Sequence, residues 1–383
     1  MGNAMQSRLI YSSDHALFRD NVRRFLQAEL EPNIEEWEKE GLVPREFWLK
    51  SAENGLLCCG VPEEYGGAGA DFYYNMVVSE EVGYALGGAS LGFGIHSDIV
   101  AYYMLNNGTE ALKKKWLPKM VSAEAISALG MTEPGAGSDL KAIRTTAIRD
   151  GDEYVINGQK TFISNGQHAD FVVLACKTDP NAGAKGISMI LVETDRPGFE
   201  RGRNLDKIGQ KAADTSEMFF NDVRVPVENL LGQEGEGFAM MMDELPRERM
   251  TVAVRAHAES QRAFDLAAQY VKERKAFGKH LIEFQNTQFK LAEIKTELAV
   301  GWAYIDQCLV KIEAESLGPE EGAMAKLWTT ETATKIIDTC LQLFGGYGYM
   351  VEYPISRLYV DNRVRRIYGG STEIMKLLIS RHV

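Results

Sequence analysis

The chain has 383 residues and a formal net charge of −12, with 45% hydrophobic and 25% charged residues. This length predicts two or three domains with a large core, and the acidic charge disfavours general affinity for nucleic acid, which needs a concentrated basic surface. No apolar run is long enough to span a membrane and no N-terminal stretch has the form of a signal peptide, so we expect a cytoplasmic protein.

The cysteines and histidines predict neither disulfides nor a metal site. The five cysteines form no CxxC pair, which suits a reducing cytoplasm. The six histidines are scattered without HExxH or a comparable spacing, so no bound metal is expected. The opening MGNAM fits a cloning remnant in residues 1–4, with Met5 as the natural start, and is excluded from the fold prediction.

The first third of the chain, residues 1–125, is predicted to be an N-terminal helical domain. Between Leu17 and Leu30, apolar residues recur at spacings of three and four, which is typical of an amphipathic helix. Ser12 or Ser13 would cap this helix and Pro32 would stop it. Further apolar stripes of helical period follow at residues 47–57, 76–86 and 95–105.

Two short motifs in this part resemble functional loops but lack their context. Residues 61–71 are rich in glycine, yet they match neither dinucleotide-binding nor P-loop spacing and are interpreted as a connection. Residues 88–92 fit GxSxG, the nucleophile elbow of serine hydrolases, which needs a strand before it and a helix after it. Because the preceding residues have a helical pattern, a hydrolase is not favoured.

Residues 126–235 are predicted to form a middle antiparallel domain resembling a β-barrel. Short β-rich runs lie between turn signals at residues 154–156, 171–176, 187–192 and 218–225. Asp150-Gly151 and Asn157-Gly158 are both hairpin signals. Strands of this length and spacing favour a small antiparallel β domain.

Residues 236–383 are predicted to form a C-terminal four-helix bundle. The helical period returns after Gly237, with helices expected at residues 238–274, 284–316 and 320–344 and a short one from Ser371. Long helices with short connections fold back into an antiparallel bundle. The fold class is therefore α+β and mainly helical.

Three segments carry residues suited to binding a cofactor. Residues 131–139 read MTEPGAGSD, in which Gly135 and Gly137 would let the chain turn and let backbone N–H groups approach a ligand. Residues 162–165 read FISN, and residues 366–376 read RIYGGSTEIMK. Together the three segments resemble the flavin-binding signature of the acyl-CoA dehydrogenase family. The resemblance covers nearly the whole chain and is greatest to the long-chain members.

This resemblance implies the acyl-CoA dehydrogenase fold, an FAD cofactor, an acyl-CoA substrate, electron-transferring flavoprotein as partner and a homotetramer. It places FAD contacts, some of them across a subunit boundary, at Leu129, Met131, Thr132, Gly137, Ser138, Phe162, Ile163, Ser164, Arg274, Gln285, Gln342, Phe344, Gly345, Gly346, Ser371, Thr372 and Glu373. It places acyl-CoA contacts at Ser138, Gly186, Ile187, Pro246, Arg247, Arg249, Gly369 and Gly370. Phe162 stands where many relatives have Trp.

The catalytic base is the main departure from the commonest family pattern. Most relatives carry it as the Glu of IYEGT, where this chain reads IYGGS and has Gly369. A minority, including long-chain and isovaleryl-CoA dehydrogenases, carry it on the first bundle helix within a pattern such as LPQERL. Residues 245–250, LPRERM, match that pattern and make Glu248 the predicted base. A charged run is usually a solvated helix face, and only its combination with Gly369 favours catalysis.

Removal of the α-proton of an acyl-CoA requires a base with a raised pKa and hydrogen-bond donors to the thioester carbonyl. Glu244, four residues earlier, would raise the pKa of Glu248, whereas Arg247 and Arg249 would lower it, and the sequence leaves the balance open. The N–H of Gly369 would bind the carbonyl oxygen, and its missing side chain would leave room beside the flavin.

The sequence thus predicts an oxidoreductase of fatty acid β-oxidation that converts a medium- or long-chain acyl-CoA to the trans-2-enoyl-CoA. Three alternatives stay open: a branched-chain or isoprenoid acyl-CoA as substrate, a flavin oxidase or monooxygenase, and a DNA-binding flavoprotein of the same fold. The last is disfavoured by the acidic charge and by Glu248. Chain length, the shape of the pocket base and the electron acceptor are not determined by the sequence.

Overall fold

The structure is a computed structural model that describes residues 8–383, so the expectation for residues 1–4 lies outside it. Ser12 caps the first helix as predicted, because its Oγ accepts the backbone N–H of His15 at 3.3 Å. The helical run ends at Leu30, before Pro32, also as predicted. The N-terminal helices are α1 Ser13–Phe25, α2 Ile34–Glu40, α3 Arg45–Glu53, α4 Phe72–Tyr84, α5 Ala101–Asn107 and α6 Glu110–Val121, with π-helical segments at Leu26–Leu30 and Gly94–Val100.

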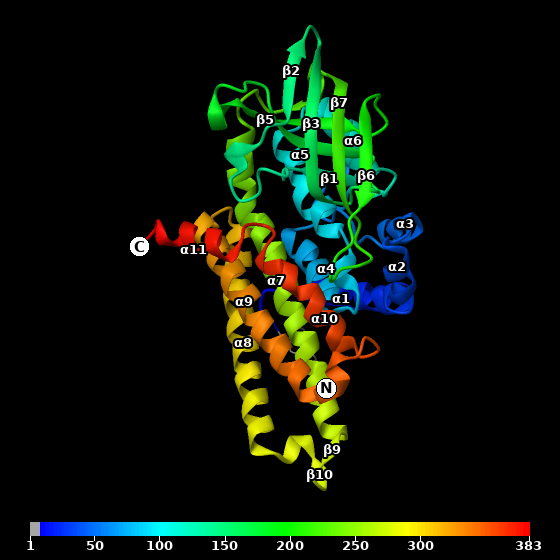
Figure 1. Ribbon diagram of the computed structural model, residues 1–383, viewed down its shortest axis with the longest axis vertical. Helices are drawn as coiled ribbons and strands as arrows, with labels where there is room; N and C mark the ends of the chain where they lie inside the picture. Colours follow the sequence, from blue (N-terminus) through cyan, green and yellow to red (C-terminus); the bar gives the residue numbers. More distant parts are fainter. Residues whose placement is uncertain (1–7) are drawn as a thin grey trace.

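A sheet follows the N-terminal helices and forms the upper part of the molecule in Figure 1. Its strands are β1 Ser127–Gly130, β2 Thr146–Asp150, β3 Glu153–Ser164, β4 Phe171–Lys177, β5 Ile187–Glu193, β6 Phe199–Asn204, β7 Thr215–Pro226 and β8 Leu230–Leu231. The order is β6-β7-β3-β2-β4-β5-β8, with β1 beside β4. The four predicted strands are present and longer than expected. The expectation of a purely antiparallel sheet is wrong at β4, which pairs in parallel with β1 and, at one position, with β2.

One of the two hairpin signals is wrong. Asp150-Gly151 does connect β2 to β3, with Gly151 at φ 66°. Asn157-Gly158 instead lies inside β3, and Gly158, at φ 149°, adjoins a β-bulge opposite β7. The pairing with β7 therefore overrides the local turn preference of this dipeptide.

The C-terminal part is a bundle of three long helices and two short ones. The elements are α7 Gly237–Glu273, the hairpin β9 Lys275–Ala276 and β10 Lys279–His280, α8 Gln285–Glu313, α9 Pro319–Phe344, α10 Pro354–Asn362 and α11 Thr372–Ser380. The long helices and α11 were predicted, but α10, the short fourth member of the bundle, was not. In Figure 1, α7 starts beside β5 and runs the length of the bundle to the β9–β10 hairpin.

Helix α7 organises the molecule because it packs against α4, α8 and α9 at once. A helix covered on several sides is expected to bury apolar residues all round. Helix α7 instead also buries charged residues, among them Glu244, Glu248, Arg249, Arg255 and Glu259. Buried charges need partners or a functional role.

The GxSxG motif lies in a setting unsuited to a nucleophile elbow. Helix α4 ends at Tyr84, and a short 3-10 turn, Gly88–Ser90, follows after a loop. A helix therefore stands where the elbow requires a strand.

Candidate active site

Glu248 is a buried carboxyl group in the first half of α7. It is 7% exposed, and its Oε1 atom is buried without a hydrogen-bond partner among residues 8–383. Burial, reinforced by the like charge of Glu244, raises the pKa of Glu248 to about 7, against the opposing influence of Tyr103, Arg247 and Arg249. The interpretation of this run as a solvated helix face is therefore wrong. A carboxyl group that titrates near neutral pH can take up a proton under physiological conditions.

The neighbours of Glu244 explain why Arg247 does not hold Glu248 ionised. Arg247 forms an ion pair with Glu244, and its guanidinium carbon lies 3.6 Å from the centre of the Tyr102 ring. Asn106 Nδ2 donates a second hydrogen bond to Glu244, at 2.6 Å. Because Glu244 and Tyr102 occupy Arg247, Glu248 has no direct ion pair within residues 8–383.

Two buried cations, Arg249 and Lys326, lie near this carboxyl group. Arg249 has no carboxylate within 4 Å in the described part of the chain, and burial lowers its pKa. Lys326 of α9 is fully buried and donates from Nζ to the carbonyl of Gly370. Burial, with the nearby charge of Arg249, lowers the pKa of Lys326 to about 8. Sequence reasoning missed Lys326, since a single lysine in a long amphipathic helix carries no local signal.

The tail loop brings Gly369 against α7 and Gly370 against α9. Their φ angles are 64° and 94°, in the left-handed region that glycine adopts without strain. A Cβ atom on Gly369 would lie 3.6 Å from Val252 Cγ2, an ordinary contact, so backbone conformation rather than space favours glycine here. Val252 follows Glu248 by one helical turn, and the structure therefore places the predicted base close to the predicted carbonyl-binding loop.

The residues after this loop begin α11. The Ser371 hydroxyl caps the helix by accepting the N–H of Ile374 at 3.4 Å. Thr372 Oγ1 donates to Glu331 Oε1 of α9 at 2.6 Å, whereas Glu373 is exposed. The loop is thus held to α9 on both sides, by Lys326 before it and Glu331 after it.

The first two predicted flavin segments lie side by side at one end of the sheet. The N–H of Thr161 donates to the carbonyl of Thr132 at 2.9 Å, and Lys160 Nζ donates to the carbonyl of Met131 at 3.0 Å. Lys160 also pairs with Glu133 at 2.8 Å, fully buried. Leu129 lies just before, in β1, and is partly buried.

The surface of these segments is open and partly aromatic. Phe162 is 67% exposed and has φ 59°, an unfavourable backbone conformation for a residue with a large side chain. Ser138 is exposed and Ser164 partly so, while the Ile163 side chain is buried in the sheet core. Gly135 turns the chain as expected, inside the tight turn closed by Glu133 and Ala136, whereas Gly137 lies just after this turn. Neither glycine needs a positive φ for this.

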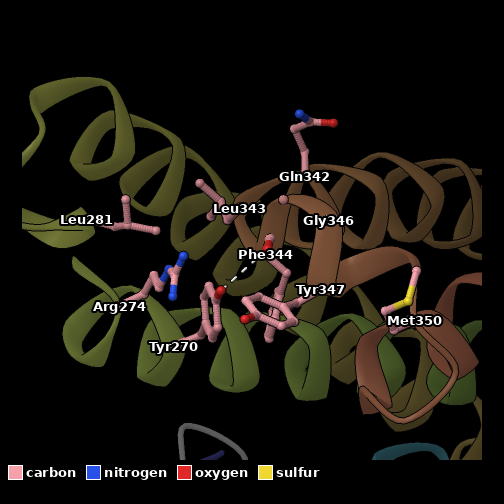
Figure 2. A pocket seen from close by; sticks show the side chains of 10 residues that line it. Tyr270, Arg274, Leu281, Gln342, Leu343, Phe344, Gly346, Tyr347 and Met350 are labelled. Carbon is pink, nitrogen blue, oxygen red and sulfur yellow. Dashed lines mark hydrogen bonds between the residues drawn. The ribbon is translucent and has the colours of Figure 1, made fainter. Parts of the chain in front are cut away.

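A third group of predicted residues lies elsewhere. Arg274, Gln342, Phe344, Gly345 and Gly346 line a pocket of about 530 Å³ at the far end of α7 and α9. Its other lining residues are Tyr270, Leu281, Leu343, Tyr347 and Met350. Figure 2 shows the Tyr270 ring beside Phe344, with which it stacks at 4.2 Å, and Gln342 pointing away from Arg274. Gln285 is exposed at the start of α8 and does not line this pocket.

The Arg274 pocket lies far from the Glu248 site along α7. Arg274 follows Glu248 by 26 residues, which corresponds to roughly 39 Å along a helix axis. One chain therefore does not bring the Arg274 pocket to the Glu248 site.

The predicted acyl-CoA contacts are also dispersed. Pro246 is buried within α7, two residues before Glu248. Gly186 and Ile187 lie at the start of β5, near Gly237 at the beginning of α7, and both are buried. Gly186 has a structural reason to be glycine, because a Cβ atom there would lie 1.9 Å from the carbonyl oxygen of Asp179.

Within residues 8–383, no three His, Cys, Asp or Glu side chains gather as a metal site would require. No helix in that range is both long and apolar enough to cross a membrane.

Comparison with known proteins identifies the family. Residues 12–124, 128–223 and 235–383 match the family models for the N-terminal, middle and C-terminal domains of acyl-CoA dehydrogenases. The chain belongs to the acyl-CoA dehydrogenase family. It is accordingly an oxidoreductase that acts on the CH–CH bond of an acyl-CoA, and members of this family use FAD.

Individual relatives cover almost the whole chain. The mitochondrial long-chain specific acyl-CoA dehydrogenase of Sus scrofa is 47% identical over 378 residues, 98% of this chain and 88% of that protein. The mitochondrial isovaleryl-CoA dehydrogenase of Solanum tuberosum is 34% identical over 382 residues, 99% of this chain and 93% of that protein. The crystal structure of an acyl-CoA dehydrogenase from Geobacillus kaustophilus is 51% identical with a TM-score of 0.95, covering 97% of this chain and 98% of that one.

Proposed function

We propose that the protein oxidises a medium- or long-chain acyl-CoA to the trans-2-enoyl-CoA, with Glu248 as the acceptor of the α-proton. The observation that carries the proposal is the burial of Glu248 beside the Gly369 loop, which raises its pKa to about 7. The higher identity to a long-chain relative than to an isovaleryl relative supports the choice of substrate. Electron-transferring flavoprotein is the proposed electron acceptor, and the cytoplasm the proposed location.

The residues around Glu248 have distinct proposed roles. The N–H of Gly369 donates to the thioester oxygen, where negative charge develops as the α-proton leaves. Lys326 fixes this loop through the carbonyl of Gly370. Arg249 adds positive potential that favours the developing enolate, and Pro246, Arg247 and Ser138 contribute to the acyl-CoA site, together with Gly186, Ile187 and Gly370.

The residues at the end of the sheet fit the FAD ring. An exposed aromatic side chain, Phe162, stands beside a loop in which a Cβ atom on Gly135 or Gly137 would meet nothing within 4 Å. A flat ring can therefore approach the backbone closely. FAD, when bound, supplies the acceptor for the β-hydride, which no side chain can provide. Its proposed contacts on this chain are Leu129, Met131, Thr132, Gly137, Ser138, Phe162, Ile163, Ser164, Ser371, Thr372 and Glu373.

The remaining FAD contacts are proposed to come from a second copy of the chain. Arg274, Gln285, Gln342, Phe344, Gly345 and Gly346 lie too far from the sheet to reach the same flavin, since 26 residues of α7 separate Arg274 from Glu248. A second subunit that presents its own Arg274 pocket completes the site. This supports an assembly of at least two copies, and a homotetramer is the assembly that we propose.

The test is anaerobic mixing of the FAD-loaded protein with acyl-CoAs of different length and branching, followed by loss of visible flavin absorbance. Glu248→Gln should retain FAD while the rate of flavin reduction falls at least about a hundredfold. The control is Asp243→Asn, which removes an exposed carboxylate from the same helix. A loss below about tenfold for Glu248→Gln, about 1.4 kcal/mol of barrier, would remove Glu248 as the base.

The same panel decides among the alternatives. Faster reduction by isovaleryl-CoA than by straight-chain thioesters would support a branched-chain enzyme. Rapid oxygen consumption by the reduced protein would support an oxidase or monooxygenase.

A further inference from the structure

Residues 94–107, which comprise a π-helical segment and α5, contact α7 between Glu244 and Arg255. Asn106 bonds to Glu244, and Tyr102 lies under Arg247. At the other end, a Cβ atom on Gly94 would lie 3.1 Å from Thr251 Cγ2 and 3.4 Å from Arg255 Nη2. Residues 94–107 therefore lie antiparallel to α7.

This contact contains several buried polar atoms that have no hydrogen-bond partner among residues 8–383. They are Oγ1 of Thr251, Nε and Nη2 of Arg255, and two atoms of neighbouring groups, Oε1 of Glu248 and the hydroxyl of Tyr103, each of which influences the pKa of the other. Glu248, Thr251 and Arg255 are spaced by three and four residues, so they lie on one face of the helix. Unpaired buried polar groups are costly, and those of a native protein call for a specific explanation.

Arg255 is the group of this set whose burial without partners is most costly, because it is charged. It is 8% exposed, and its single hydrogen bond within residues 8–383 is from Nη1 to the carbonyl of Leu91, at 3.0 Å. Nearby Asp98 already accepts hydrogen bonds from Asn75 at 2.8 Å and from Ser79 at 3.1 Å. Glu259 is paired with Arg365. No carboxylate of residues 8–383 lies within 4 Å of Arg255.

The unused edge of Arg255 has a recognisable geometry. Nε and Nη2 form the side of a guanidinium that binds a carboxylate with two parallel hydrogen bonds. Arg357 uses this same edge for Glu38, at 2.8 and 3.1 Å, and Arg365 uses it for Glu259. In Arg255 neither atom of this buried edge has a hydrogen-bond partner in the described part of the chain, and the Thr251 hydroxyl, likewise without a partner there, lies one helical turn away.

We propose that Arg255 binds a carboxylate at the distal end of the acyl chain, so that the protein accepts CoA monothioesters of dicarboxylic acids. The inference rests on the proposed function, since Glu248 marks the position of the thioester. Seven residues separate Glu248 from Arg255, roughly 10 Å of helix, a distance that suits a chain of medium length. Thr251 donates a further hydrogen bond to the carboxylate.

The experiment compares pairs of thioesters with equal carbon number, one ending in a methyl group and the other in a carboxylate. Rates of anaerobic flavin reduction are measured on the FAD-loaded protein over a series of chain lengths. We expect the carboxylate-terminated thioester to be favoured at least about tenfold at one medium length, because an apolar pocket would instead reject a buried charge.

Variants then test whether the preference for a terminal carboxylate depends on Arg255. Arg255→Met should lower the carboxylate-to-methyl rate ratio at least about tenfold, since it replaces the bidentate donor with an apolar side chain of similar length. Arg255→Lys, which keeps the charge without the planar edge, should give an intermediate ratio. Arg357→Met is the control, because the same edge of Arg357 is already occupied by Glu38, and its ratio should equal that of the unmodified protein.

The outcomes separate this inference from the proposed function. If methyl-terminated thioesters reduce the flavin in a Glu248-dependent way but the carboxylate-terminated ones do not, Arg255 is satisfied by internal water and the inference is wrong. If neither series reduces the flavin, the proposed function itself is wrong. If Arg255→Met fails to retain FAD, Thr251→Val is measured in its place. The inference is wrong if the carboxylate-to-methyl rate ratio is near one in the unmodified protein and is unchanged in Thr251→Val.

Discussion

Replacing Glu244 by Gln tests the electrostatic origin of the proposed base. Glu244 is the charged neighbour that raises the pKa of Glu248, and it also holds Arg247 in an ion pair. The substitution removes the repulsion and releases Arg247, and both effects favour ionised Glu248. Gln keeps an acceptor oxygen for Asn106, so the packing at this point is preserved. The pKa of Glu248 should therefore fall.

The size of the fall follows from the helix geometry. Residues four apart have Cβ atoms about 5–6 Å apart, which places the two carboxylates roughly 7 Å apart. With an effective dielectric constant between about 20 and about 80, the repulsion is about 0.6 to about 2.4 kcal/mol. This corresponds to a shift of about one pH unit.

The assay is the pH dependence of kcat/KM, which reports ionisations of the free enzyme. In the unmodified protein, activity should fall as the pH drops through about 7, because Glu248 becomes protonated. In Glu244→Gln this limb should move down by about one unit, giving about a fivefold gain in relative rate near pH 6. Asp243→Asn serves as the control for removal of an exposed charge. An unmoved limb, or one shifted upward, would refute the reasoning.

Three further substitutions probe stability, cofactor binding and loop position. The pKa of Glu248 in the folded protein, about 7, exceeds its ordinary value of 4.5, so stability is lost as the pH rises between these values. Glu248→Gln removes this loss. In urea titrations it should therefore raise the free energy of unfolding by up to about 3 kcal/mol more at pH 8 than at pH 4.5. Phe162→Gly should relieve the left-handed backbone, stabilising the protein without cofactor by about 1 kcal/mol, yet weaken FAD retention on dilution; tighter retention would contradict the contact. Lys326→Met removes the donor to Gly370 and should slow flavin reduction at least about tenfold with FAD still bound, whereas an unchanged rate would exclude a positioning role.

Local sequence was sufficient wherever an element carries its own periodic signal. The long helices α7, α8 and α9 and the strands β4, β5 and β7 have patterns that need no partner to be recognised. The short elements were missed because their structure depends on neighbours: β1 is ordered by parallel pairing with β4, and α10 by packing on α9. Gly158 shows the same dependence, since pairing with β7 places a turn dipeptide within a strand.

The sequence by itself determined the family resemblance and singled out Glu248 through its run of residues and the glycine at 369. Only the tertiary structure decided the state of that carboxyl group, because burial and the engagement of Arg247 by Glu244 and Tyr102 arise from elements far apart in the chain. The unpaired edge of Arg255 likewise became visible only in three dimensions. The charge of a side chain can be read from sequence, whereas its solvation and its partners are properties of the packed fold.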